Sequence, residues 1–181
     1  MRRTLPLVVA LLLTGCGGAE QEPFVLAQAA EPQNAELGWR ESHPAGVGAR
    51  LVFEVDTLDV TADGWSVGVA VVNRTGIDFE IDTGPTDYGL GLMLFANDDL
   101  KALVDADREG QLPAIRRATR IEPRPPRILR PGATWRATLS APGSLADGSW
   151  VRVVFGTFLG QDEPPDEFAR VVWFTDRAHR L

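Results

Sequence analysis

Hydrophobic and polar residues alternate with a period of two along most of the chain after residue 50, and this period is typical of half-buried β-strands. The cleanest example is Ile77-Asp78-Phe79-Glu80-Ile81-Asp82, in which each apolar residue is followed by an acidic one. Such a strand buries one face and leaves the other in water. The alternation predicts about eight short strands, over residues 50–56, 65–72, 77–82, 90–94, 116–121, 134–139, 150–158 and 168–175.

Turn-forming residues separate most of these segments, at Asp63-Gly64, Asn73-Arg74-Thr75-Gly76, Gly84-Pro85, Pro131-Gly132 and Asp147-Gly148. One short helix is predicted over residues 99–106, because Asp98 is a good N-cap and Gly110 a good C-terminal stop. The three prolines within residues 122–127 predict an extended crossing or an edge segment, since proline cannot donate a hydrogen bond to a sheet. Residues 161–166 are acidic and proline-rich, which indicates a loop.

The number and spacing of these strands predict an all-β chain, an antiparallel immunoglobulin-like β-sandwich of about seven to eight strands. Two stretches of the chain resemble sequences in immunoglobulin-like domains of bacterial exported proteins. They are Val71-Val72-Asn73-Arg74-Thr75, and Leu129-Arg130-Pro131-Gly132 followed by Gly148-Ser149-Trp150-Val151-Arg152-Val153. In those domains the asparagine stretch closes an early strand and the Pro-Gly turn opens a late one. The resemblance implies a fold and no particular activity.

The start of the chain has the layout of an export signal. Arg2 and Arg3 supply positive charge, and residues 5–13 form an apolar run that is shorter than the ~20 residues of a membrane-spanning helix. The sequence at its end, Leu13-Thr14-Gly15-Cys16, resembles the lipobox of bacterial lipoproteins. The resemblance implies that the Cys16 thiol receives a diacylglyceryl group and that the signal is cut just before it. The alternative is an ordinary secretory signal followed by a chance cysteine.

This signal divides the chain into a signal peptide at residues 1–15, a lipidated N-terminus and flexible linker at residues 16–46, and one immunoglobulin-like domain at residues 47–181. The linker lacks a regular hydrophobic period, and a flexible coil of ~30 residues spans about 30 Å. Its apolar exceptions, Phe24-Val25-Leu26 and Trp39, are candidates to dock on the domain. Two acyl chains hold a protein durably on a bilayer. We therefore expect the protein to be located in the cell envelope, on the extracytoplasmic side of a bacterial membrane.

The amino-acid composition argues against several kinds of partner and site. Cys16 is the only cysteine of the 181 residues, so the domain has no disulfide bond. The chain has 18 basic and 25 acidic residues, and loss of residues 1–15 removes two arginines and no acid, which takes the net charge from −7 to −9. This charge and a sequence pI of about 4.8 argue against nucleic acid as a partner. With two distant histidines and one lipidated cysteine, neither a zinc or redox-metal site nor a cofactor is expected.

A local run of arginines departs from the acidic average, with Glu122 as the acidic residue among them. Such charge segregation predicts a surface for an anionic partner, such as lipid headgroups, an envelope polymer or an acidic protein. The alternative is that the arginines pair with the domain's own carboxylates and serve solubility. The members of this arginine belt are Arg116, Arg117, Arg120, Arg124, Arg127, Arg130 and Arg136.

One motif suggests catalysis. Gly64-Trp65-Ser66-Val67-Gly68 matches G-x-S-x-G, the nucleophile elbow of α/β-hydrolases, which needs a strand, a strained turn and then a helix. Here the serine falls inside a predicted strand and no helix follows. The histidines available to activate it are His43 and His179. We therefore expect a chance match and no enzyme activity.

A second motif suggests calcium. Asp105-Ala106-Asp107-Arg108-Glu109-Gly110 resembles the first half of an EF-hand loop, with oxygens at positions 1, 3 and 5 and glycine at position 6. Pro113 stands at the ninth position, and Arg116 stands at the twelfth, where the loop requires a bidentate glutamate. A solvated acidic turn is the expected outcome.

The five tryptophans are either an aromatic platform for sugars or part of the core, and the strand phase favours the core for Trp65 and Trp135. The set is Trp39, Trp65, Trp135, Trp150 and Trp173.

These patterns predict a lipid-anchored envelope protein whose domain is a non-catalytic binding or interaction module for a protein or an anionic polymer. The alternative is a small-ligand or metal-binding lipoprotein, such as a transport accessory, which a deep pocket lined by converging polar groups would favour.

Overall fold

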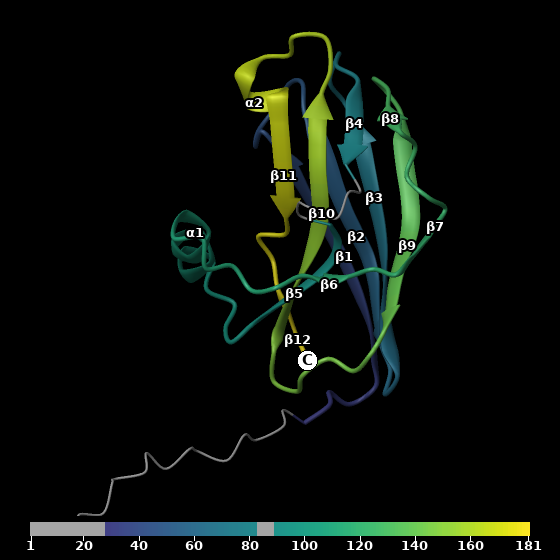
Figure 1. Cartoon of the computed structure of the whole chain (residues 1–181), viewed down its shortest axis with the longest axis vertical. Helices are drawn as coiled ribbons and strands as arrows, with labels where there is room; N and C mark the ends of the chain where they lie inside the picture. The colour runs from purple at the N-terminus through teal and green to yellow at the C-terminus, as the bar shows by residue number, and fades with distance from the viewer. Residues whose placement is uncertain (1–27, 83–88) are drawn as a thin grey trace, which may run out of the picture.

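The computed structural model describes residues 28–82 and 89–181. This part of the chain forms two antiparallel sheets and two short helices (Figure 1), which confirms the all-β prediction. The first sheet has the order β1 (Gln33–His43), β2 (Leu51–Val60), β3 (Gly64–Asn73), β9 (Thr134–Pro142) and β7 (Arg120–Glu122). The second contains β6 (Arg116–Arg117), β5 (Leu90–Phe95), β10 (Trp150–Gly160), β4 (Phe79–Asp82), β8 (Ile128–Leu129), β11 (Arg170–Phe174) and β12 (His179–Arg180). The helices are α1 (Leu100–Arg108) and α2 (Asp166–Ala169).

The second sheet is built on β10, which is long enough to pair with four other strands. Along one edge its first half pairs with β5 and its second half with β4. Along the other edge its first residues pair with β12 and the remainder with β11. Two-residue strands then continue the first edge outward, since β6 pairs with β5 and β8 pairs with β4.

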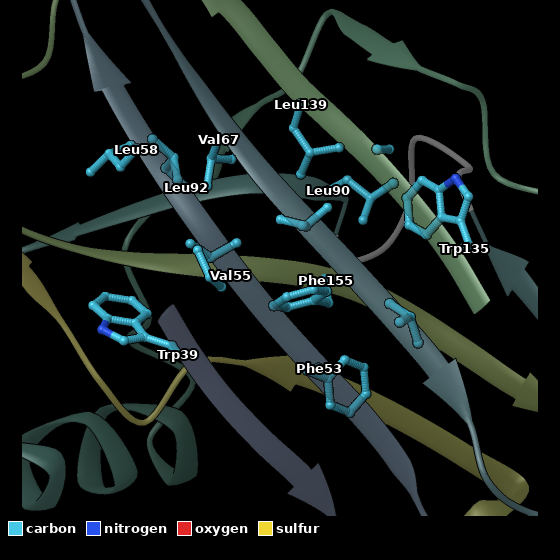
Figure 2. Close-up of a cluster of buried hydrophobic side chains, with 14 of the residues drawn as sticks. Trp39, Phe53, Val55, Leu58, Val67, Leu90, Leu92, Trp135, Leu139 and Phe155 are labelled. Carbon is cyan, nitrogen blue, oxygen red and sulfur yellow. The ribbon is translucent and has the colours of Figure 1, made fainter. Parts of the chain in front are cut away.

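The two sheets face each other across one hydrophobic core, shown in Figure 2. Phe53 of β2 lies against Phe155 of β10 with ring centroids 5.1 Å apart. On β3 the predicted inward residues are all buried, from Trp65 to Val71 in steps of two. Trp135 and Leu139 of β9 complete the same face, so the phase predicted for these central strands is confirmed.

The linker predicted at residues 16–46 is wrong in its second half, because residues 33–43 form β1 and pair with β2 along its length. The domain therefore begins well before residue 47. Leu37 and Trp39 pack against the core, as expected for Trp39. The strand was missed because Gln33 and Glu41, which also point inward, are polar, so the alternation of apolar and polar residues is lost. A bulge at Gly38, whose φ is +56°, interrupts the alternation as well.

Three further boundaries differ from the predictions. The helix begins after Asp99, whose side chain accepts from the backbone N–H of Lys101 at 2.8 Å, so Asp99 is the N-cap in place of Asp98. The strand predicted over residues 116–121 is two short strands, β6 and β7, that belong to different sheets. Phe168 lies in α2, and the last long strand begins at Arg170.

Both ends of the described chain lie at the same pole of the two-sheet stack (Figure 1). Near the N-terminal end, the N–H of Ala30 donates to the carbonyl of Leu145 at 2.8 Å, and the N–H of Asp147 donates to the carbonyl of Gln28 at 2.8 Å. At the C-terminus, the N–H of Leu181 donates to the carbonyl of Ser149 at 2.8 Å. The loop between β9 and β10 thus holds both ends, and we refer to this end of the domain as the tether pole.

Candidate interaction surface

The strap, residues 116–129, joins the edges of the two sheets along one flank of the domain (Figure 1). It leaves the second sheet after β6, pairs with β9 of the first sheet through β7, and returns to the second sheet at β8. Three prolines follow β7, and since they carry no N–H the ladder cannot continue there. Five members of the arginine belt lie on this strap, while Arg130 follows it and Arg136 belongs to β9.

Inward contacts decide which way the strap arginines point. Ala118 and Ile121 pack against the core. The indole Nε1 of Trp135 donates to the carbonyl of Pro123 at 3.2 Å, and the N–H of Thr119 donates to the carbonyl of Ser140 at 2.9 Å. These contacts hold the strap against the sheets, and every member of the arginine belt is exposed to solvent.

Three of the seven belt arginines form ion pairs within the domain. Arg120 pairs with Glu122 on the same strand at 2.8 Å, and Arg127 lies 3.5 Å from Glu80. Arg136 reaches Glu54 of β2 at 3.1 Å. Exposed pairs of this kind are each worth about 0–1 kcal/mol, so they hold the side chains loosely.

The remaining belt members differ from one another. Arg117 lies against Gly89, where an added Cβ would come within 2.7 Å of the guanidinium. Arg116, Arg124 and Arg130 form no ion pair with any residue in 28–82 or 89–181. The arginine belt is therefore a mixture of engaged and available cations, and the two alternatives posed by the sequence each describe part of it.

The G-x-S-x-G motif forms the first half of β3. Ser66 is on the outer face of β3, opposite Ser140 of β9 and Asp59 of β2, and β3 continues to Asn73 without a helix. His43 makes its hydrogen bond to the carbonyl of Glu167 at 3.0 Å, and His179 makes its own to Gln33. The motif lacks the turn that an elbow needs.

The acidic stretch predicted to be a turn is helical in its first half. Asp105 to Arg108 belong to α1, where Asp105 pairs with Lys101 at 2.5 Å, and this pairing lowers the pKa of Asp105. Glu109 is the C-cap, and Gly110 follows with a φ of +67°. The first positions of an EF-hand loop must wrap around the ion, whereas Asp105 and Asp107 are held within a helix here. Over the described residues, no group of three or more His, Cys, Asp or Glu side chains is arranged to hold a metal ion.

The tryptophans do not form one platform. Trp39, Trp65 and Trp135 are buried in the core. Trp173 of β11 stacks on Phe53, with ring centroids 5.0 Å apart and an angle of 6° between the planes. Trp150 lies at the start of β10 and is half-buried.

The sequence analysis did not predict a buried arginine. Arg152 of β10 is fully buried, and its guanidinium donates to the carbonyls of Thr175 and Asp98, each at 2.9 Å, and to that of Asp176. Desolvation lowers the pKa of Arg152, and nearby carboxylates such as Glu41 oppose that shift. An arginine inside an apolar strand, Trp150-Val151-Arg152-Val153-Val154, was the signal available in the sequence.

Glu41 belongs to the same cluster. Its carboxylate accepts the backbone N–H groups of Asp176 at 3.0 Å and Arg177 at 3.2 Å. Burial raises the pKa of Glu41, and these two hydrogen bonds oppose the rise. Arg152 thus binds carbonyl groups, and Glu41 binds N–H groups, of the segment between β11 and β12. Together they fix that segment on the sheets.

No family model, curated protein or solved structure matches this chain. In the part of the chain that the structure describes, no helix has the length and apolar character needed to cross a membrane. Cys16, the residue of the predicted lipid attachment, lies outside the described residues, as do Phe24-Val25-Leu26.

Proposed function

We propose that this protein is a lipid-anchored component of a bacterial cell envelope and that its β-sandwich is a non-catalytic interaction module. The observation that carries the proposal is the tether pole. The backbone of Gln28 and Ala30 is hydrogen-bonded there, twelve residues after the lipobox cysteine Cys16. A chain anchored at Cys16 would therefore hold the domain by one defined end.

The length of the connection limits how far the domain stands from the bilayer. Eleven residues separate Cys16 from Gln28, so even a fully extended chain spans at most about 40 Å. The tether pole is therefore the end of the domain that is joined most directly to the attachment point, and the strap flank is left open to other envelope components.

The topology supports an immunoglobulin-like fold for the module. Constant-type immunoglobulin domains place strands A, B, E and D in one sheet and C, F and G in the other. Here β2, β3, β9 and β7 have the order and chain positions of the first set. The second set corresponds to β5 with β4, β10 and β11. The B–F disulfide of antibody domains has no counterpart, because Cys16 is the only cysteine.

The partner surface that we favour is the strap flank. Arg116, Arg124 and Arg130 have no carboxylate partner among the described residues, and the pairs of Arg120 and Arg127 are exposed and weak. Guanidinium groups bind carboxylates and phosphates through two parallel hydrogen bonds. An envelope protein or polymer with anionic groups fits this surface.

The lipid anchor is tested by replacing Cys16 with Ser in the full chain and expressing both forms in a bacterium that processes lipoproteins. We expect the parent protein in the membrane fraction, with its mature N-terminus at residue 16 and the added mass of acyl chains. The C16S variant should lack both the acyl mass and the cleavage before residue 16. A G18A variant, which keeps the cysteine, is the matched control. Acylation and cleavage of C16S at the same position would refute the proposal.

A further inference from the structure

The first sheet ends in two very different edge strands. At one edge is β7, with three residues, and at the other is β1, with eleven residues that pair only with β2. The strands at the ends of the second sheet, β6, β8, β11 and β12, have five residues or fewer. Proteins commonly keep edge strands short, because a long edge presents unpaired N–H and C=O groups to other chains. Among the edge strands of the described residues, β1 is the exception.

Hydrogen bonds beside β2 fix which backbone groups of β1 face the open edge. Arg50 and Arg74 exchange both of their backbone hydrogen bonds, at 2.9 and 3.4 Å. The backbone groups of successive residues in an antiparallel strand point alternately to its two sides. Every second residue counted from Arg50 therefore bonds to β3, as far as the bulge after Val55, and the residues between them bond to β1. In the register of β1 and β2, this leaves Arg40 and Ser42 facing the open edge.

The same alternation applies at the start of β1. The N–H of Thr61 donates to the carbonyl of Gly64 at 2.8 Å, so Thr61 faces β3. Counting back along β2 from Thr61 leaves Asn34 and Glu36 of β1 facing the open edge. Within residues 28–82 and 89–181, no backbone hydrogen bond joins β1 to a residue outside β2. The open edge of β1 therefore offers backbone donors and acceptors on both sides of its centre.

The side chains along this open edge are complementary to a second copy of themselves. Gly38 lies midway between Glu36 and Arg40, and both charged side chains are exposed. When two copies of β1 pair antiparallel about Gly38, Glu36 of each copy lies opposite Arg40 of the other, and Asn34 lies opposite Ser42. Opposite charges in directly opposed pairs stabilise a sheet, and like charges destabilise it. Pairing centred on Glu36 or on Arg40 would oppose like charges, so the charges select the register centred on Gly38.

We propose that two copies of this chain associate through the open edge of β1, with two-fold symmetry about Gly38. The two five-stranded sheets then join into one continuous sheet. Because each copy contributes the same surface, the contact is closed and stops at a dimer. β7 lies at the opposite edge of each first sheet, so the strap flank stays accessible in the dimer. This inference goes beyond the proposed function and does not require the lipid anchor.

Two local features suit this contact. The bulge between Glu36 and Trp39 bends β1, so the pairing is confined to the residues on either side of it. At the centre, Gly38 has no side chain and no described atom lies within 4 Å of a Cβ added there, so two backbones can approach. On the outer face, Arg40 donates to Glu54, whose carboxylate also binds Arg136 at 3.1 Å. The carboxylate opposite Arg40 in the second copy extends this row of alternating charges.

Such a dimer can be anchored at Cys16 to one bilayer. Its two-fold axis lies across the strands, so the two domains run in opposite directions and their tether poles lie at opposite ends. When the axis is normal to the bilayer, both tether poles are equally far from it. The connection from Cys16 to Gln28, of at most about 40 Å in each chain, then reaches the bilayer on both sides.

The test is sedimentation equilibrium of the full chain in density-matched detergent, over a range of protein concentrations. We expect the mass of a dimer for the parent. Glu36→Arg opposes two arginines at both contacts, and Arg40→Glu opposes two glutamates, so each variant should raise the dissociation constant at least about tenfold. The double variant E36R/R40E, and an equimolar mixture of E36R with R40E, bring opposite charges together and should restore the dimer. The matched control is E31R, because Glu31 is exposed and precedes β1.

Cross-linking in membranes with a short thiol reagent tests the register. N34C and S42C in separate chains should cross-link to each other, since directly opposed residues have Cα atoms about 5.5 Å apart. Two chains of N34C should not, because position 34 of one copy lies about 26 Å along the strand from position 34 of the other. The parent, with Cys16 as its only cysteine, is the control for background cross-linking.

Three results would overturn the proposal. A parent that stays monomeric at every concentration would exclude the dimer. A dimer that E36R and R40E leave unchanged, or that E31R weakens equally, would exclude the contact through β1. Cross-linking of N34C to itself as efficiently as to S42C would exclude the register about Gly38. Each of these results leaves acylation at Cys16 untouched, because mass spectrometry of the same protein reports it separately.

Discussion

The guanidinium of Arg152 donates a 2.9 Å hydrogen bond to the backbone carbonyl of Thr175, a residue that follows β11, from a side chain with no solvent exposure. The same guanidinium reaches the carbonyl of Asp98, which precedes α1. One charge thus ties two connections to the central strand of the second sheet. All the hydrogen-bond acceptors found for this guanidinium among the described residues are backbone carbonyls. Its charge is therefore stabilised at hydrogen-bond distance by peptide dipoles and not by a carboxylate.

Replacing Arg152 with Met should destabilise the domain by about 1–3 kcal/mol, since buried carbonyls lose their donor. The measurement is urea-induced unfolding of the full chain. Arg124→Met is the matched control, because Arg124 is exposed and surface substitutions usually change stability by less than about 0.5 kcal/mol. Equal midpoints for the parent and R152M would show that these hydrogen bonds contribute nothing net.

Glu41 makes stability depend on pH. Its pKa in the folded state lies above the ordinary value of 4.5, so folding favours its protonated form. That contribution is complete below pH 4.5 and is lost as the pH rises through the folded pKa. Glu41→Gln removes the titration, so the stability of E41Q relative to the parent should rise with pH above 4.5.

The measurement is urea unfolding of both proteins at intervals from pH 4 upward. Glu36→Gln is the control, because Glu36 is an exposed residue of the same strand. A stability difference between E41Q and the parent that stays constant, or that falls as the pH rises, would contradict the predicted direction.

Trp135 links the core to the strap. It is buried, and its indole donates to the carbonyl of Pro123. Trp135→Ala should cost about 3–5 kcal/mol, as is usual for a buried large aromatic residue. Trp135→Phe keeps most of the packing and loses the hydrogen bond, so we expect a smaller loss than in W135A. Proteolysis of the strap provides a second readout, and W135F should be cleaved faster there than the parent.

Asn73 is the last residue of β3, and it holds both the turn that follows it and the distant strand β8. Its Nδ2 donates to the carbonyls of Ile77 at 2.7 Å and Leu129 at 2.9 Å, while its Oδ1 accepts from Thr75. Asn73→Asp removes the donor and places a carboxylate beside two carbonyls, so we expect a loss of at least about 1–3 kcal/mol. Thr75→Ser keeps the hydroxyl and serves as the control. A melting temperature of N73D equal to that of T75S would be the contrary result.

The sequence by itself determined the central strands. In β3 and β9 the inward apolar residues recur every second position, and in β2 they do so on each side of the bulge between Val55 and Leu58, because one face of each strand is covered by the other sheet. Trp65 and Trp135 were placed in the core on this basis, and both are buried there. Turns such as Pro131-Gly132 were also predicted from local chemistry, and Gly132 has the expected positive φ of 74°.

Only the tertiary structure decided the edges of the sheets and the buried polar groups. β1 was taken for a linker because its inward Gln33 and Glu41 are polar, and they are satisfied by His179 and by backbone near Asp176, more than 130 residues away in the chain. The single strand predicted over residues 116–121 is divided into β6 and β7, which belong to two sheets whose edges meet only after folding. A local period records which face of a strand is covered. It does not record which distant groups arrive at an edge, and so the backbone partners of Arg152 were not visible in the pattern.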